Sequence, residues 1–272
     1  MSYWWEVVSL LTTTCVTAVT LVANGIPTDV EAVSNEFNTQ ITPASYAFAI
    51  WGVIYTWQVL WLGYAWSLVL RPNDVRTISA GAYWAYALAN GCNILWIQVW
   101  TSKRMEAALV VFVLLNIFLY AAIGLLWVQF DGTKKAVSRR DYWLTWALPV
   151  NGLFCYTTWT TLAVFINLAT VLQYFEGFGA TDSGTVSLVL LTITILAYMV
   201  LENTVFRRFT RYVFTVYPVL IWALIGILVA HWSADSRNAI YVLVLLLAVI
   251  AYIAIKAISS VQRQPAAKPH DS

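Results

Sequence analysis

The sequence predicts an all-α integral membrane protein with eight transmembrane helices. Of its 272 residues, 61% are hydrophobic and only 10% are charged, and the mean hydropathy is +0.72. A soluble domain carries about 25% charged residues, which it needs to cover its surface. This chain has too few charges for a water-solvated surface, so we expect a lipid bilayer to surround most of its length.

Eight apolar segments follow one another along the chain, each long enough to cross a bilayer as a helix of about 20 residues. They cover residues 4–24, 45–70, 78–101, 104–129, 143–173, 184–205, 210–231 and 238–260. Turn-forming residues separate them, and the very short connection at 101–104 predicts a tight helical hairpin. No basic region precedes the first segment, so we interpret it as a retained helix rather than a removable signal peptide.

The positions of Lys and Arg predict the topology. With eight spans both chain ends lie on one side, and that side receives 12 of the 15 basic residues, all except Lys103, Arg104 and Arg237. Because cytoplasmic loops are enriched in Lys and Arg, both termini are predicted to be cytoplasmic, in a membrane that the sequence does not specify. Residues 261–272 are polar and contain proline, which predicts a disordered tail.

Aromatic and amide side chains recur on single helical faces inside three of these segments. Positions three and four residues apart share a face of a helix. Such stripes are Trp51, Tyr55 and Gln58 in the second segment; Tyr86, Asn90, Asn93, Ile97 and Trp100 in the third; and Tyr156, Trp159, Ala163 and Asn167 in the fifth. Three facing stripes predict a flat aromatic cavity with a few polar groups, which suits a planar apolar ligand.

Each of these residues also has a structural interpretation. An asparagine inside the membrane often joins helices by hydrogen bonds, and a tryptophan near a helix end usually anchors the helix at the membrane surface. Trp51, Trp96 and Trp159 fit the second explanation less well, because each lies inside its segment beside a polar group.

The chain has no recognisable catalytic or metal-binding pattern, and we predict no catalytic residue, no metal ligand and no cofactor. His231 lies at a loop edge and His270 in the tail, without the spacing of a metal site. Phosphate-binding loops and nucleophile elbows are absent, and no basic patch indicates a nucleic-acid partner. Cys15, Cys92 and Cys155 lie in apolar segments and are interpreted as packing residues. Glu202 fits a charge-paired helix end beside Arg207 and Arg208, although an ion path is an alternative.

Three short motifs in the second, third and fifth segments are similar to those of a known membrane family. The second segment begins Pro43-Ala44-Ser45-Tyr46-Ala47-Phe48-Ala49-Ile50-Trp51 and continues to Tyr55, the third contains Asn93-Ile94-Leu95-Trp96, and the fifth contains Trp159, Ala163 and Asn167 at spacings of four. In order and position these motifs resemble those of the TspO/translocator-protein family, the tryptophan-rich sensory proteins. A second proline after Pro43 and a tryptophan in the first loop, both typical of that family, are absent here.

The resemblance covers residues 1–175 and implies a TspO-like five-helix membrane domain whose cavity, closed by the first loop, binds porphyrins or sterols. Residues 176–260 are three additional transmembrane helices, and 261–272 form the tail. The resemblance and the stripes together select the candidate ligand-binding residues Pro43, Trp51, Tyr55, Asn93, Trp96, Tyr156, Trp159, Ala163 and Asn167.

The favoured function is a multi-pass membrane receptor or sensor that binds a planar hydrophobic ligand, either a tetrapyrrole such as porphyrin or a sterol-like molecule. One alternative is a small-solute transporter that uses all eight helices, including Glu202 and the interrupted segment around Pro218 and Gly226. Another is a structural protein whose aromatic residues only pack. A fourth is an enzyme acting on a bound porphyrin through its tryptophans. The sequence leaves a homodimer open.

Overall fold

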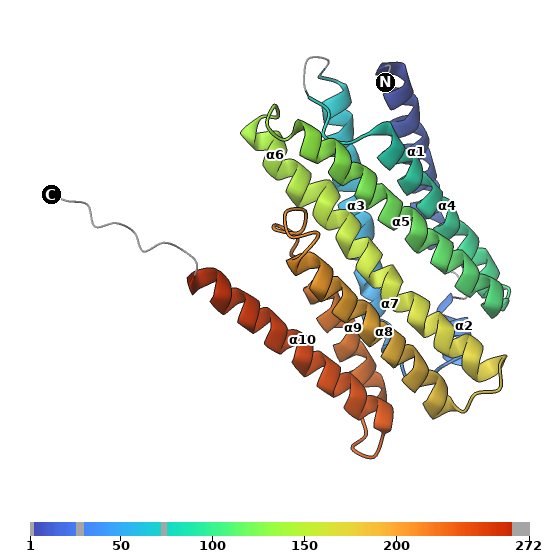
Figure 1. The fold of residues 1–272 in the computed structure, drawn as a ribbon. Helices are drawn as coiled ribbons and strands as arrows, with labels where there is room; N and C mark the ends of the chain where they lie inside the picture. Colours follow the sequence, from blue (N-terminus) through green and yellow to red (C-terminus); the bar gives the residue numbers. More distant parts are fainter. Residues whose placement is uncertain (1–2, 26–29, 72–74, 263–272) are drawn as a thin grey trace.

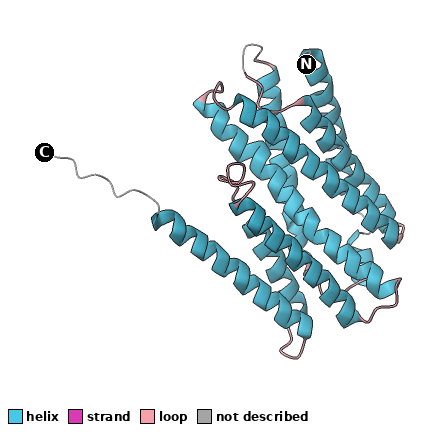
Figure 2. Ribbon diagram, in the orientation of Figure 1, coloured by secondary structure: helices cyan, strands magenta, loops and turns pink. Residues whose placement is uncertain are grey.

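The computed structural model describes residues 3–25, 30–71 and 75–262, and within these ranges the chain is helical without strands (Figure 2). Its elements are α1 (Tyr3–Gly25), α2 (Val30–Glu36), the 3₁₀ helix η1 (Ser45–Ala49), α3 (Ile50–Val69), α4 (Ala80–Thr101), α5 (Met105–Thr133), α6 (Arg139–Thr145), the π-helical turn η2 (Trp146–Val150), α7 (Asn151–Tyr174), α8 (Ala180–Asn203), α9 (Val216–His231) and α10 (Arg237–Gln262). Helix α10 continues two residues into the predicted tail, and the rest of that tail, 263–272, lies outside the described residues.

Each predicted apolar segment coincides with one helix or with one continuous helical run. The second segment combines η1 with α3, and the fifth combines α6, η2 and α7. By length and composition, five of the described helices can cross a membrane: α1, α5, the α6–α7 run, α8 and α10. Helix α9 is apolar but has only 16 residues. Helices α3 and α4 are 20 and 22 residues long, but their many Trp, Tyr and amide side chains lower their hydropathy.

The helices form one bundle, and neighbours in sequence are mostly neighbours in space (Figure 1). Helix α4 lies between α1 and α5. The short connection at residues 102–104 joins α4 to α5 and forms the predicted hairpin. Helix α7 is central, because α3, α5, α8 and α9 all pack against it. Helix α10 lies at the edge of the bundle and packs mainly against α9 and α8.

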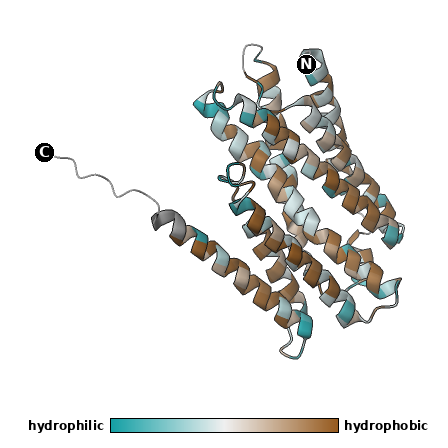
Figure 3. Ribbon diagram, in the orientation of Figure 1, coloured by the Kyte–Doolittle hydropathy of each residue, from teal (hydrophilic) through white to brown (hydrophobic). Residues whose placement is uncertain are grey.

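Hydrophobic residues occur along most of the length of the helices (Figure 3). Many of their side chains are exposed on the outside of the bundle, and others form its core. Val128, Val229 and Val244 are exposed by 76%, 64% and 61%, and each lies on a different helix. Soluble monomers rarely expose apolar surface on this scale, whereas hydrocarbon solvates it without cost. The outward face is therefore the one expected of helices in lipid.

Amide side chains join the helices, as one interpretation of the sequence predicted. Asn90 of α4 donates to the Thr17 hydroxyl of α1 over 2.9 Å, and Asn24 donates to Asn93 Oδ1 over 3.0 Å. Asn116 of α5 accepts a hydrogen bond from the Thr160 hydroxyl of α7 at 3.0 Å. Each bond satisfies a buried polar group inside an apolar helix, which would otherwise be costly.

The α6–α7 run changes its winding at Pro149, which lies in η2. Proline has no backbone N–H to donate, and a π-helical turn accommodates this interruption. The next polar residue, Asn151, donates its amide to the Tyr212 carbonyl over 3.0 Å and accepts from the Phe214 N–H at 2.9 Å. Asn151 thereby fixes the loop 204–215, which leads into α9, against the start of α7.

Glu202, near the end of α8, is buried, and its carboxylate holds the last three helices together. It accepts hydrogen bonds from the Tyr217 hydroxyl of α9 and the Tyr252 hydroxyl of α10. Lys256 of α10 forms an ion pair with it at 2.9 Å. The carboxylate is thus charge-paired as expected, but its partner lies on α10 rather than at Arg207 or Arg208.

Candidate ligand-binding cavity

A small aromatic cavity lies where α3, α4 and α7 meet below the first loop. Five of the nine candidate residues line it: Trp51, Trp96, Trp159, Ala163 and Asn167. The rest of its lining comes from the first loop and from neighbouring helices and consists of Ser34, Phe37, Thr42, Phe48, Trp100, Phe112, Ile166 and Thr170. Its volume is about 40 Å³. The three tryptophans that the sequence singled out therefore share one hollow, although each comes from a different helix.

Aromatic rings pack edge to face around this hollow. The ring centroids of Trp51 and Trp159 are 6.4 Å apart at an interplanar angle of 86°, and Phe48 meets Trp159 at 6.0 Å and 89°. Tyr55 stacks on the other side of Trp51 at 5.4 Å. Perpendicular and offset contacts of this kind are favourable for aromatic pairs.

Trp96 and Asn167 supply a polar group at the cavity wall. The indole N–H of Trp96 donates to Asn167 Oδ1 over 3.3 Å, and the Asn167 amide donates to the Ala163 carbonyl over 2.8 Å. Ile97, which also lies on the aromatic side of α4, does not line the cavity. The single indole N–H of Trp96 is engaged in this bond, whereas Asn167 keeps a second amide hydrogen and a second oxygen lone pair for a polar atom of a ligand.

The first loop closes this end of the bundle over the cavity. Ser34 of α2 and Phe37 line the cavity, and the Phe37 ring contacts Tyr174 at the end of α7 with centroids 5.2 Å apart. The Tyr174 hydroxyl also donates to the Asn38 carbonyl over 2.8 Å. Phe37 thus supplies an aromatic ring in a loop that lacks the tryptophan typical of the family resembled.

Three further candidate residues, Tyr55, Asn93 and Tyr156, lie behind Trp51 in a buried polar cluster. The Tyr55 hydroxyl is buried without a hydrogen-bond partner among the described residues. The Tyr156 hydroxyl and the Asn93 amide lie near each other but make no well-formed hydrogen bond. The Tyr86 hydroxyl and the Gln58 amide, from the same helical stripes, share this property. Trp51, which lines the aromatic cavity, contacts Tyr156 at 6.0 Å between ring centroids, so this cluster adjoins the cavity. Unpaired buried polar groups are rare and often mark functional sites.

Pro43, the remaining candidate, is buried but does not line the cavity. Its Cβ atom lies 3.1 Å from the position that a Cβ on Gly226 of α9 would take. Pro43 therefore supports the cavity by fixing η1 against α9, and η1 leads directly to Phe48 and Trp51.

Comparison with family models shows which protein family the chain belongs to. The family model described as TSPO-like protein matches residues 3–257. The chain belongs to the TSPO-like family. The match extends through α8, α9 and most of α10, beyond the residues 1–175 on which the sequence motifs depend. Searches of curated proteins and of solved structures each found no match. With its apolar helices, this TSPO-like protein is an integral membrane protein of a sensor or ligand-binding type.

Phe37, Phe48 and Phe112 contribute cavity surface in this TSPO-like protein but are absent from the candidate set. Phe48 stands in the second-segment motif, three residues before Trp51, and that spacing could have placed it on the same face. Phe112 of α5 contacts Trp96 at 4.7 Å, but α5 has an almost uniformly apolar sequence. Helical periodicity therefore could not show which face of α5 points toward the cavity.

The cavity offers surface and orientation rather than acid–base chemistry. Among the described residues, no carboxylate or histidine lines it. Across the described parts of the chain, no group of three His, Cys, Asp or Glu side chains is placed to hold a metal ion. What the geometry can do is stack aromatic rings on a flat molecule and hydrogen-bond it through Asn167.

Proposed function

We propose that this TSPO-like protein is a membrane receptor or sensor that binds a planar hydrophobic ligand, a tetrapyrrole or a sterol-like molecule, in the aromatic cavity. The observation that supports this most strongly is the meeting of Trp51, Trp96 and Trp159, from three helices, around one hollow. Random interfacial anchoring would leave these rings facing lipid at helix ends. Trp96 and Trp159 are instead buried, with 9% and 2% exposure.

Binding requires the cavity to enlarge. Small-molecule pockets usually measure about 300–1,000 Å³, whereas this cavity holds about 40 Å³. Phe48 and Trp51 are only partly buried, so their rings are the side chains that give way most easily. When Trp51 moves, the cavity joins the polar cluster behind it, where Tyr55, Asn93 and Tyr156 have free hydrogen-bonding capacity. We propose that these groups orient the polar edge of the ligand.

We propose that all eight long helices cross the bilayer, with both chain ends in the cytoplasm. The short length of α9 is compatible with a span because η1 and the first loop meet its far end, where His231 contacts the Thr42 carbonyl at 2.7 Å. Residues 1–175 then form the ligand-binding unit. Residues 176–260 form a three-helix support, which contacts that unit through α7 and η1.

Titration of the purified full chain with protoporphyrin tests the proposal. We expect saturable quenching of the fluorescence of its 15 tryptophans. The substitution Ala163→Phe places a ring in the cavity and is expected to raise the Kd at least tenfold, equal to about 1.4 kcal/mol of binding free energy. Trp51→Phe keeps an aromatic ring but reduces its area, so a smaller rise is expected. Competition by a sterol distinguishes the two ligand classes.

Two matched variants control for general effects of these changes. Ala121→Phe adds the same ring to an exposed position on α5, and Trp4→Phe removes an indole that is 72% exposed. Both are expected to leave the Kd unchanged. A Kd that is equal in the wild type and in Ala163→Phe, with the variant still folded by thermal unfolding, would contradict the proposed site.

A further inference from the structure

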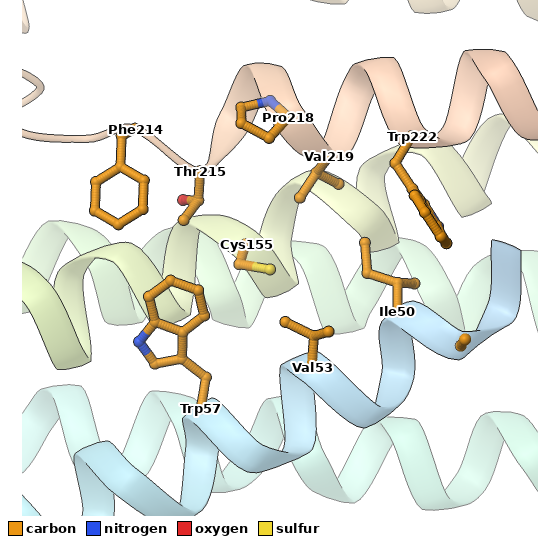
Figure 4. Close-up of a pocket in the computed structure, with 10 residues that line it drawn as sticks. Ile50, Val53, Trp57, Cys155, Phe214, Thr215, Pro218, Val219 and Trp222 are labelled. Carbon is orange, nitrogen blue, oxygen red and sulfur yellow. The ribbon is translucent and has the colours of Figure 1, made fainter.

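A second, larger crevice lies between α3, α7 and α9 (Figure 4). Its volume is about 340 Å³ and it opens to the outside of the bundle. Val53 and Trp57 of α3 form one wall, and Pro218 and Trp222 of α9 form the other, with Cys155 of α7 at the floor. None of these residues belongs to the candidate site described above.

The lining of this crevice offers almost no free hydrogen-bonding group. The Trp57 indole donates to the Ala147 carbonyl over 3.0 Å, and the Trp222 indole donates to the Ala47 carbonyl over 2.8 Å. The Thr215 hydroxyl donates to the backbone carbonyl of Asn151 over 3.0 Å. Since the polar atoms are already paired, the crevice fits a hydrocarbon chain better than a polar molecule.

One end of the crevice lies beside a cluster of arginines. Phe214 lines the crevice, and Arg211 stands only three residues before it, at most about 10 Å along the chain. Arg207, Arg208 and Arg211 are all exposed. Asp131 is the one carboxylate that pairs with any of the three among the described residues, at 3.7 Å from Arg208.

The loop that bears these arginines is held firmly at the bundle surface. Its Phe209 ring stacks on Trp127 of α5 with centroids 5.2 Å apart, and Tyr212 meets Trp143 of α6 at 5.0 Å. Aromatic rings beside exposed cations are typical of the boundary between hydrocarbon and headgroups. The arginines are therefore at a depth where a lipid phosphate would lie.

We propose that this crevice binds an anionic phospholipid, with one acyl chain between α3 and α9 and the phosphate at Arg207 and Arg211. The crevice runs from Phe214, in the loop just before α9, to Trp222 of α9. Its α9 part, from Val216 to Trp222, covers six residue steps, about 9 Å of helix rise. This is less than half of the hydrocarbon core, which is about 30 Å thick, so the chain stays within the leaflet that the arginines face. The bidentate geometry of guanidinium groups suits a phosphate.

Lipid retention by the purified full chain tests this proposal. The protein is incubated with equal amounts of phosphatidylglycerol and phosphatidylcholine, and the lipids that remain bound are counted by native mass spectrometry. We expect at least tenfold preference for phosphatidylglycerol in the wild type. The double variant Arg207→Gln/Arg211→Gln is expected to lose that preference, and Val53→Trp, which fills the crevice, is expected to reduce retention of both lipids. Ala49→Phe fills the same crevice from an exposed position and replaces Val53→Trp if that variant does not fold.

Controls remove equal charge or add equal bulk elsewhere. Arg104→Gln/Lys135→Gln removes two exposed cations outside the crevice, and Val244→Trp enlarges an exposed apolar residue of α10. Both should retain phosphatidylglycerol as the wild type does. Equal retention of the two lipids by the wild type, or a preference that survives the loss of both arginines, would overturn the proposal. The crevice shares no lining residue with the aromatic cavity, so the two proposals can fail separately.

Discussion

Replacing Gly226 by valine is expected to destabilise the protein by about 2–6 kcal/mol and to weaken ligand binding in the aromatic cavity. A Cβ on this residue of α9 would lie 2.9 Å from the Ala47 Cβ and 3.1 Å from the Pro43 Cβ. Neither neighbour has a flexible side chain that can turn aside, so α9 must move away from η1. Overpacking alone costs about 1–3 kcal/mol. The Ala44 N–H, which donates to the Gly226 carbonyl over 3.0 Å, then loses its partner at a further cost of about 1–3 kcal/mol.

The effect reaches the cavity because α9 holds the segment that leads into it. Besides the bond at Gly226, Trp222 donates to the Ala47 carbonyl over 2.8 Å, and His231 contacts the Thr42 carbonyl at 2.7 Å. Thr42, which His231 contacts, and Phe48, which directly follows Ala47, both line the cavity. A displacement of η1 therefore moves two parts of the cavity wall.

The measurement combines thermal unfolding with the protoporphyrin Kd. Gly124→Val is the matched control, because a Cβ at this position of α5 meets nothing within 4 Å and valine is a better helix former than glycine. We expect Gly124→Val to leave both quantities near those of the wild type. A Gly226→Val protein with an unchanged unfolding temperature would show that α9 and η1 are less tightly joined than these distances require.

Much of the helical architecture could be predicted because a membrane protein has few ways to satisfy its backbone. An apolar segment in lipid must be helical, and Gly, Pro and Asp mark the interruptions, as at Asp131-Gly132 near the end of α5. Helical periodicity assigned Trp51 and Trp159 to the faces that line the cavity, whereas Trp96 was selected by its motif with Asn93, because the third-segment stripe contained Ile97 instead. The length of α9 was less predictable, because the apolar segment 210–231 begins inside the ordered loop before it.

Contacts between helices that are distant in sequence could not be predicted. Periodicity assigns a residue to a face but does not say which helix lies opposite that face. Pro43 was therefore placed among ligand-binding residues, although it packs toward α9. The role of Asn93 as an acceptor from Asn24 was hidden for the same reason, as was the crevice between α3 and α9. Glu202 shows most clearly that sequence proximity does not identify a partner. Arg207 and Arg208, which are near it in sequence, were the predicted partners, but it pairs with Lys256, which is 54 residues away.

Replacing Glu202 by leucine is expected to destabilise the protein by about 3 kcal/mol and to free α10 from the bundle. Removing one member of a buried ion pair usually costs about 3–5 kcal/mol, and the lower end applies here because the Lys256 side chain is 43% exposed and can return to water. The hydroxyls of Tyr217 and Tyr252 lose their acceptor as well. Since α10 packs mainly against α8 and α9, it is the helix that this loss releases first.

Proteolysis of the α9–α10 connection and thermal unfolding together measure this effect. We expect faster cleavage near Ser233–Ser236 in Glu202→Leu, a smaller effect in Lys256→Met, and a double variant less destabilised than the sum of the two, because the residues interact directly. Asp182→Leu removes a carboxylate whose ion pair with Arg237 is exposed, so this substitution should destabilise the protein only slightly.

If Glu202→Leu were as stable as the wild type but lost solute flux in proteoliposomes, the buried carboxylate would serve transport rather than assembly. An unchanged protoporphyrin Kd in Glu202→Leu is also expected, because α10 does not reach the aromatic cavity.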